Sequence, residues 1–151
     1  MSDLGTILRS GDQSDFTWLK ALAGLAADAE EASPDAEGEI FAKLCGLLSS
    51  APAYLSEQIL SSIQYDRIEV LLDAQAYESA ALHFLSDKFG YMMSSGPGRK
   101  RISISVWIPD LCEEITVKAS SETLALIVGV STALLHAYGS ENRRDYEANL
   151  N

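Results

Sequence analysis

The apolar residues of this chain change from helical spacing to strict alternation after residue 100, and this change constrains the fold more than any other feature. Across residues 101–108 isoleucine and valine alternate with arginine, serine and tryptophan, which is typical of a strand with one face on a core. Residues 114–118 alternate in the same way beyond a turn at 109–112, so we predict an antiparallel hairpin. Residues 91–94 are a candidate third strand, turning back through the loop formers at 95–98.

Helical spacing is clear at the start of the chain. The first predicted helix begins near Ser14, a suitable N-cap, and ends near Glu31. The second begins at Ser33 and Pro34, because a capping residue followed by proline is typical of a first helical turn. The apolar residues at 40–48 then repeat as one face of an amphipathic helix.

A third helix is predicted to open at Pro52. Its apolar positions fall four residues apart, on one stripe, at Leu55, Ile59 and Ile63. Residues 66–72 fit either a short buried strand or a further helical turn, and we favour the helix.

Two further helices follow from the same spacing. One is predicted over about 74–89, with Gly90 as its terminator in the left-handed conformation. The other is predicted over 120–138, with Ser120 or Ser121 as its cap and Gly139 after its end. This last helix is apolar almost all round, which is typical of a helix buried between layers or used in an oligomer interface.

The order of these elements predicts an α+β domain, with N-terminal helices, a small antiparallel sheet of two or three strands and a C-terminal buried helix. Residues 1–151 are long enough to fold around one core, so a single domain is expected. Within it we distinguish a helical subregion at 1–63, a helix-hairpin-helix subregion at 64–139 and a polar tail at 140–151, expected to be mobile at its end.

The chain is strongly acidic, with a formal net charge of −11. Nucleic-acid binding rests on Lys and Arg displacing counterions, so this charge argues against DNA or RNA as a partner. The longest apolar stretch, Leu124–Ala137, is too short to predict a membrane span, and the N-terminus carries acid where a secretory signal would carry base. We therefore expect a cytoplasmic protein without a membrane partner.

The candidates for chemistry are sparse. Cys45 and Cys112 are the only cysteines and lie far apart, which excludes a Cys-x-x-Cys zinc pair. Asp110, Glu113 and Glu114 lack the spacing of a calcium loop, so a solvated acidic turn is the favoured interpretation. We predict no catalytic residue, no metal site and no cofactor.

The two histidines are the remaining candidates for proton transfer. His83 falls inside the predicted 74–89 helix, and His136 falls in the last turn of the predicted 120–138 helix, where a positive charge is stabilised by the helix dipole. Neither has a nucleophile or carboxylate at a spacing that an acid-base scheme demands. A structural role is favoured for both.

Trp107 and a short basic run are the candidate partner-binding residues. Trp107 projects to the face of its strand opposite the isoleucines, where it either packs under a helix, the favoured interpretation, or anchors a partner. Arg99, Lys100 and Arg101 form the one basic cluster of the chain, either as a solvated turn, the favoured interpretation, or as a site for a phosphate or an acidic partner.

These observations favour a small, acidic, non-enzymatic protein-protein interaction module that forms a homodimer or binds a partner protein. Self-association through a sheet edge or through the last helix would suit that role. One alternative is an acidic inhibitor or nucleic-acid-charge mimic of the immunity, phage or mobile-element type, binding a basic site. The other is an enzyme with a site around His83 or His136.

Overall fold

The computed structural model describes residues 12–85, 87–95 and 101–150. The elements in chain order are α2 (Asp12–Glu31), the 3₁₀ turn η1 (Pro34–Ala36), α3 (Glu37–Ser49), α4 (Ala53–Gln58), the 3₁₀ turn η2 (Leu60–Ser62), α5 (Tyr65–Asp73), α6 (Tyr77–Leu82), β1 (Gly90–Ser95), β2 (Ile102–Ile108), β3 (Cys112–Ala119) and α7 (Glu122–Leu150). Helices therefore precede a three-stranded antiparallel sheet, and one long helix follows it. The predicted α+β class is confirmed.

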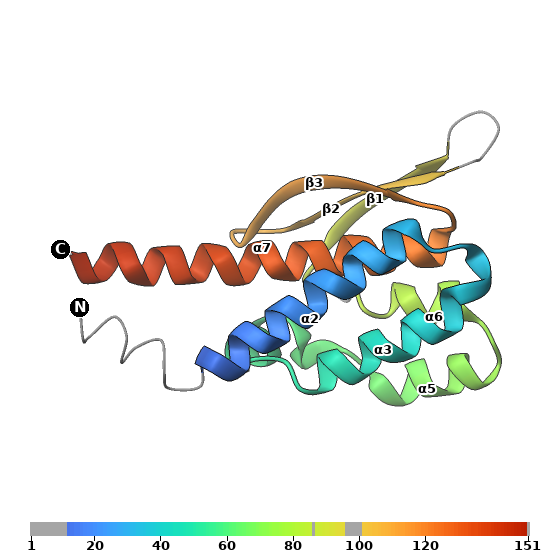
Figure 1. Ribbon diagram of the computed structural model, residues 1–151, viewed down its shortest axis with the longest axis horizontal. Coiled ribbons are helices and arrows are strands. Elements are labelled where there is room, and N and C mark those ends of the chain that lie inside the picture. Colours follow the sequence, from blue (N-terminus) through green and yellow to red (C-terminus); the bar gives the residue numbers. More distant parts are fainter. Residues whose placement is uncertain (1–11, 86, 96–100, 151) are drawn as a thin grey trace.

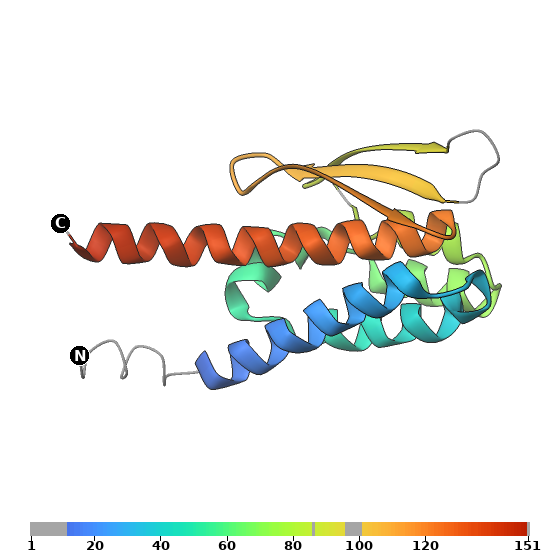
Figure 2. The ribbon, with the colours of Figure 1, turned by 45° about the horizontal axis from the view of Figure 1, so that its top comes forward.

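Helix α7 runs through the middle of the molecule (Figure 1). The sheet covers one side of it, and the N-terminal helices cover the other, with α2 lying alongside (Figures 1 and 2). Residues 123–128 of α7 are all buried, which explains why this segment is apolar all round. By length and composition alone Glu122–Gly139 could cross a membrane, but 67% of that segment is buried inside the fold, as in the core helix of a globular protein.

The sheet sits close against α7 because a glycine lies at the contact. A Cβ atom on Gly129 would come within 2.7 Å of Val106 Cγ2 and 3.3 Å of Ile104 Cγ2. Both of these β2 side chains are fully buried, so they have no free space in which to move away. The absence of a side chain at this position lets the helix backbone approach the central strand.

The strands lie in the order β1-β2-β3, with β2 in the centre. Ile102 pairs with Ala119, and Ile104 pairs with Val117, in the hairpin that the alternation predicted. The β2–β3 register shifts between Val106 and Ile108, a local irregularity of the β-bulge kind. The third strand is present as β1, which pairs antiparallel to β2 along its whole length.

The first two predicted helices are present, with small changes at their starts. Helix α2 begins at Asp12, two residues before the predicted cap Ser14. The second helix opens as the 3₁₀ turn η1, with Pro34 in its first turn, before α3 continues. Trp18 Nε1 donates a hydrogen bond of 2.6 Å to the Leu47 carbonyl and so joins α2 to the end of α3.

The third helix predicted from Pro52 begins as expected, because Pro52 precedes α4 (Ala53–Gln58), but the helix is shorter than the apolar stripe predicted. Helix α4 ends at Gln58, and the chain continues as η2. Leu55, Ile59 and Ile63 are nevertheless all buried in the core, so the apolar stripe persists although the helix is interrupted. The favoured assignment of residues 66–72 as helix is confirmed by α5.

The predicted helix over 74–89 is also wrong in its length. Gln75 has a φ of 57°, and the left-handed backbone there ends the preceding helix and delays α6 to Tyr77. After Leu82 the chain forms turns up to the start of β1. Gly90 is therefore the first residue of a strand and not a helix terminator.

The final helix continues past the predicted stop at Gly139. Helix α7 extends to Leu150 and projects beyond the sheet (Figure 1). A glycine ends a helix when the next residues leave it, but the residues after Gly139 include good helix formers such as Glu141, Arg143 and Arg144. The polar segment at 140–150 is therefore part of the helix.

The cap of α7 is formed as predicted by one of the two serines. The Leu124 backbone N–H donates to Ser121 Oγ at 3.2 Å. That hydroxyl in turn donates to Glu37 Oε2 at 2.5 Å, which links the start of α7 to the first turn of α3. Ser120 Oγ donates instead to the Ala32 carbonyl at 2.7 Å.

Candidate functional site

The outer edge of strand β1 is the most distinctive exposed feature of the sheet. β1 is paired on one side only, with β2. Every second residue of an edge strand directs its backbone N–H and C=O away from the sheet, so β1 presents a row of groups that another strand can pair. Figure 2 shows β1 at the rim of the sheet, away from α2.

The side chains of β1 do nothing to discourage pairing. The strand reads Gly-Tyr-Met-Met-Ser-Ser and contains no Lys, Arg, Asp, Glu or Pro. Tyr91 is 42% exposed and Met92 is 61% exposed, so two of the large apolar side chains that reach solvent lie on this one strand. Natural proteins usually protect an edge with charge, proline or a bulge, and β1 has none of these.

The two faces of β1 differ in what they contact. Residues opposite each other in an antiparallel pair share a face, so Met92 lies on the outer face with Ser105, and Met93 lies on the inner face with the buried Ile104. Met93 is half-buried against the core, whereas Tyr91, on the same inner face, remains exposed. Helix α7 packs under β2 and β3, which leaves the inner face of β1 only partly covered.

Trp107 lies on the outer face, but no described helix covers it. Its strand partner across the sheet is Gly90, and a Cβ atom on Gly90 would come within 2.1 Å of the indole Cε2 and 2.2 Å of Nε1. The indole therefore lies directly against the Gly90 backbone, and both Trp107 and Gly90 are half-buried. The favoured expectation of a covering helix is wrong, because the helices that the structure describes lie on the inner side of the sheet (Figure 2).

The basic cluster is only partly described. Arg99 and Lys100 lie outside the described residues. Arg101 donates from Nη2 to the Glu30 carbonyl at 3.1 Å and to the Lys118 carbonyl at 3.3 Å. Arg101 thus joins the end of α2 to strand β3, which is an intramolecular role for this member of the cluster.

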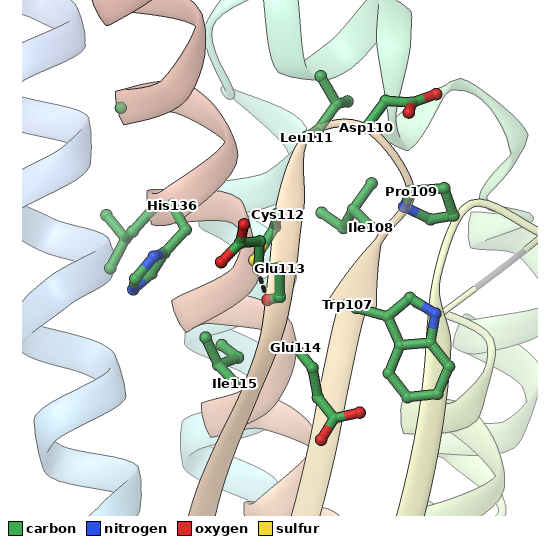
Figure 3. Close-up of a pocket in the computed structure, with 12 residues that line it drawn as sticks. Trp107, Ile108, Pro109, Asp110, Leu111, Cys112, Glu113, Glu114, Ile115 and His136 are labelled. Carbon is green, nitrogen blue, oxygen red and sulfur yellow. Dashed lines mark hydrogen bonds between the residues drawn. The ribbon is translucent and has the colours of Figure 1, made fainter.

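An open groove of about 1150 Å³ lies between the end of the β2–β3 hairpin and α7 (Figure 3). It is lined by apolar residues and by the carboxylates of Asp110, Glu113 and Glu114. Trp107 and His136 stand on opposite sides of the two strands in this view, so they do not converge on one point. The groove has an acidic rim but no assembled catalytic group.

The environment of His136 differs from the one predicted. α7 continues to Leu150, so His136 lies inside the helix and not in its last turn, and the expected interaction with the helix C-terminus is absent. Its side chain is exposed on the wall of the groove.

A second hollow, of about 330 Å³, contains His83 with Ser62 and Asp87. His83 follows the end of α6 and is half-buried. Ser62 Oγ donates directly to Asp87 Oδ1 at 3.1 Å, and among the described residues no hydrogen bond joins His83 to either of them. In a hydrolytic triad the histidine stands between the serine and the carboxylate, so this arrangement does not activate Ser62.

Neither cysteine is set up as a nucleophile. Burial, together with a smaller effect of the nearby Glu69 carboxylate, raises the pKa of the Cys45 thiol to about 11. Burial also raises the pKa of Cys112. Both thiols are therefore protonated near neutral pH. Within the part of the chain that the structure describes, no group of His, Cys, Asp or Glu side chains is placed to hold a metal ion.

Sequence reasoning found Trp107, a candidate third strand at 91–94 and a sheet edge as a possible self-association surface, but it did not identify β1 as that edge. Residues 91–94 carry only a weak strand pattern, and their identity as an edge depends on which strand pairs with which. The absence of any charge between Phe89 and Gly98 is the signal that points to it. Comparisons of the chain with protein-family models, with curated proteins and with solved structures found no match.

Proposed function

We propose that this chain is a non-enzymatic protein-interaction module that binds a second polypeptide by adding an extended segment to the β1 edge. The unprotected edge of β1 carries this proposal. Strand addition gains main-chain hydrogen bonds along the edge, and side-chain contacts at alternate positions give it selectivity. On β1 those contacts come from Tyr91 and Met92, whose exposed apolar surface would be buried by the added strand.

A display library of random peptides, selected on the immobilised chain, tests this proposal without a known partner. Enriched peptides are then measured on two charge-matched variants, M92K/S94K on β1 and Q58K/S61K on the far helices, all four positions being exposed. We expect the peptides to bind the wild type and Q58K/S61K but not M92K/S94K. Peptides that bind all three proteins equally would show that β1 does not receive them.

A second candidate function is the binding of a basic partner at the acidic end of the β2–β3 hairpin. Asp110, Glu113 and Glu114 all line the groove at this end of the hairpin. Carboxylates at this end of the molecule would attract a cationic surface. The chain would then act as an acidic inhibitor or a nucleic-acid-charge mimic. The test is the salt dependence of binding to a polylysine surface, with E113Q/E114Q as the variant that loses it.

A further inference from the structure

We infer that the strand added to β1 comes from a second copy of this chain, an inference that rests on the proposed strand addition. The first support is geometric. A continuous antiparallel sheet across a two-fold axis requires paired residues to lie on the same face, so the two strands must meet in a register centred on one residue of β1. Centring on Met92 places Tyr91 of each copy opposite Met93 of the other on the inner face.

This register buries side chains of β1 that are exposed or only partly covered in a single copy. Tyr91 and Met93 lie, with Ser95, on the partly covered inner face of β1, and an aromatic ring beside a thioether is a favourable cross-strand contact. On the outer face the exposed Met92 of each copy meets its own counterpart. Helix α7 packs under β2 and β3, so the two copies of α7 would flank the joined strands without competing for the same space.

The distribution of charge favours a second copy over a cationic segment. Each copy has a net charge of −11, so two copies repel each other over most of their surfaces. β1 carries no charged side chain, which makes it the place where two such copies meet with the least local repulsion. β1 itself offers a cationic partner no carboxylate, because those on the rim of the groove belong to the hairpin end of β2 and β3.

Sedimentation velocity over a range of concentrations, at about 10 mM and about 500 mM salt, tests the inference. We expect a monomer–dimer equilibrium that shifts toward dimer at high salt, because salt screens the repulsion between two acidic copies. M92K/S94K sets lysines opposite each other in the registers centred on Met92 and on Met93, so its dimerisation should be weaker by about tenfold or more. Q58K/S61K has the same charge change away from the edge and should dimerise as the wild type does.

The outcomes separate this inference from the proposed function. A wild-type chain that stays monomeric at every concentration, while display-selected peptides still require an intact β1, would overturn self-pairing and leave strand addition standing. A dimer that M92K/S94K forms as well as the wild type would overturn the β1 interface. Circular dichroism of both variants shows whether they keep the fold, and all the substituted side chains are exposed in the wild type.

Discussion

The two edges of this small sheet are built in opposite ways. β3, at one edge, carries Glu113, Glu114 and Lys118 as exposed charges, and its register with β2 is irregular. Its far end is held to α2, through Arg101 on the Glu30 carbonyl and through Ser120 on the Ala32 carbonyl. β1, at the other edge, is uncharged, regularly paired and exposed.

This difference shows that protection of an edge is a property of a few side chains and not of the sheet. The chain has abundant charge, with 22 acidic and 11 basic residues, yet none of it falls on β1. A strand of that composition is a hazard in a protein that must remain monomeric, since it invites edge-to-edge pairing. We interpret this unprotected strand as a functional edge, in line with the proposed strand addition.

The largest expected effect comes from destabilising β2, the central strand, which pairs with both edge strands. Ile104 is fully buried in β2 and faces Gly129 of α7, so I104A removes packing that no neighbour can replace. We expect a loss of about 2–5 kcal/mol in the free energy of unfolding, measured by urea denaturation. S103A, on the outer face next to it, should stay within about 0.5 kcal/mol. Equal losses for the two variants would contradict the assignment of the faces.

The next effect concerns the β1 edge alone. G90A places a Cβ atom against the Trp107 indole and forces the ring to move, which should cost about 1–3 kcal/mol. In a W107A background the same substitution meets no ring, so its cost should fall. A double-mutant cycle by urea denaturation measures the difference. The same cost in both backgrounds would mean that the indole does not pack on Gly90.

A smaller effect is expected at the end of β3, where a hydrogen bond from Ser120 joins it to the segment after α2. S120A removes the hydrogen bond to the Ala32 carbonyl, and we expect a loss of about 0.5–1.5 kcal/mol together with faster amide exchange at the end of β3. The variant should remain in the same oligomeric state as the wild type, because the charges of β3 still protect that edge. New association of S120A would show that the tie to α2, and not charge, protects β3.

The smallest change in stability should come from removing those charges. In E113T/E114T/K118T all three substitutions are on exposed positions, so each should alter the free energy of unfolding by no more than about 0.5 kcal/mol. The variant would, however, have two unprotected edges. Light scattering should then detect assemblies larger than the dimer that we expect for the wild type. A variant that assembles as the wild type does would show that the irregular register alone protects β3.

The fold class follows from patterns that are local in the sequence. The alternation at Ile102–Ile108 and the helical spacing around Phe41 each describe a single element, and both elements are present. The boundaries that failed depend on information outside the element. Gln75 adopts a left-handed backbone that nothing in its sequence signals, and Gly139 lies in a helix whose later residues continue it.

The candidate site was less predictable, because it is defined by pairing between distant segments. Trp107 could be placed on the outer face from alternation alone, but its contact with Gly90 depends on the β1–β2 register. The exposure of Tyr91 depends on where α7 lies beneath the sheet. A sequence pattern gives the face of a residue more readily than it gives the neighbour that covers it.

Amide hydrogen exchange of β1 and β3, measured at low and high protein concentration, tests the central claim most directly. The account predicts that the outward-facing amides of β1 exchange quickly in dilute solution and become protected as concentration rises, while those of β3 do not change. Protection that rises on β3, or on neither strand, would contradict the claim that β1 is the edge through which this chain pairs with a second copy of itself.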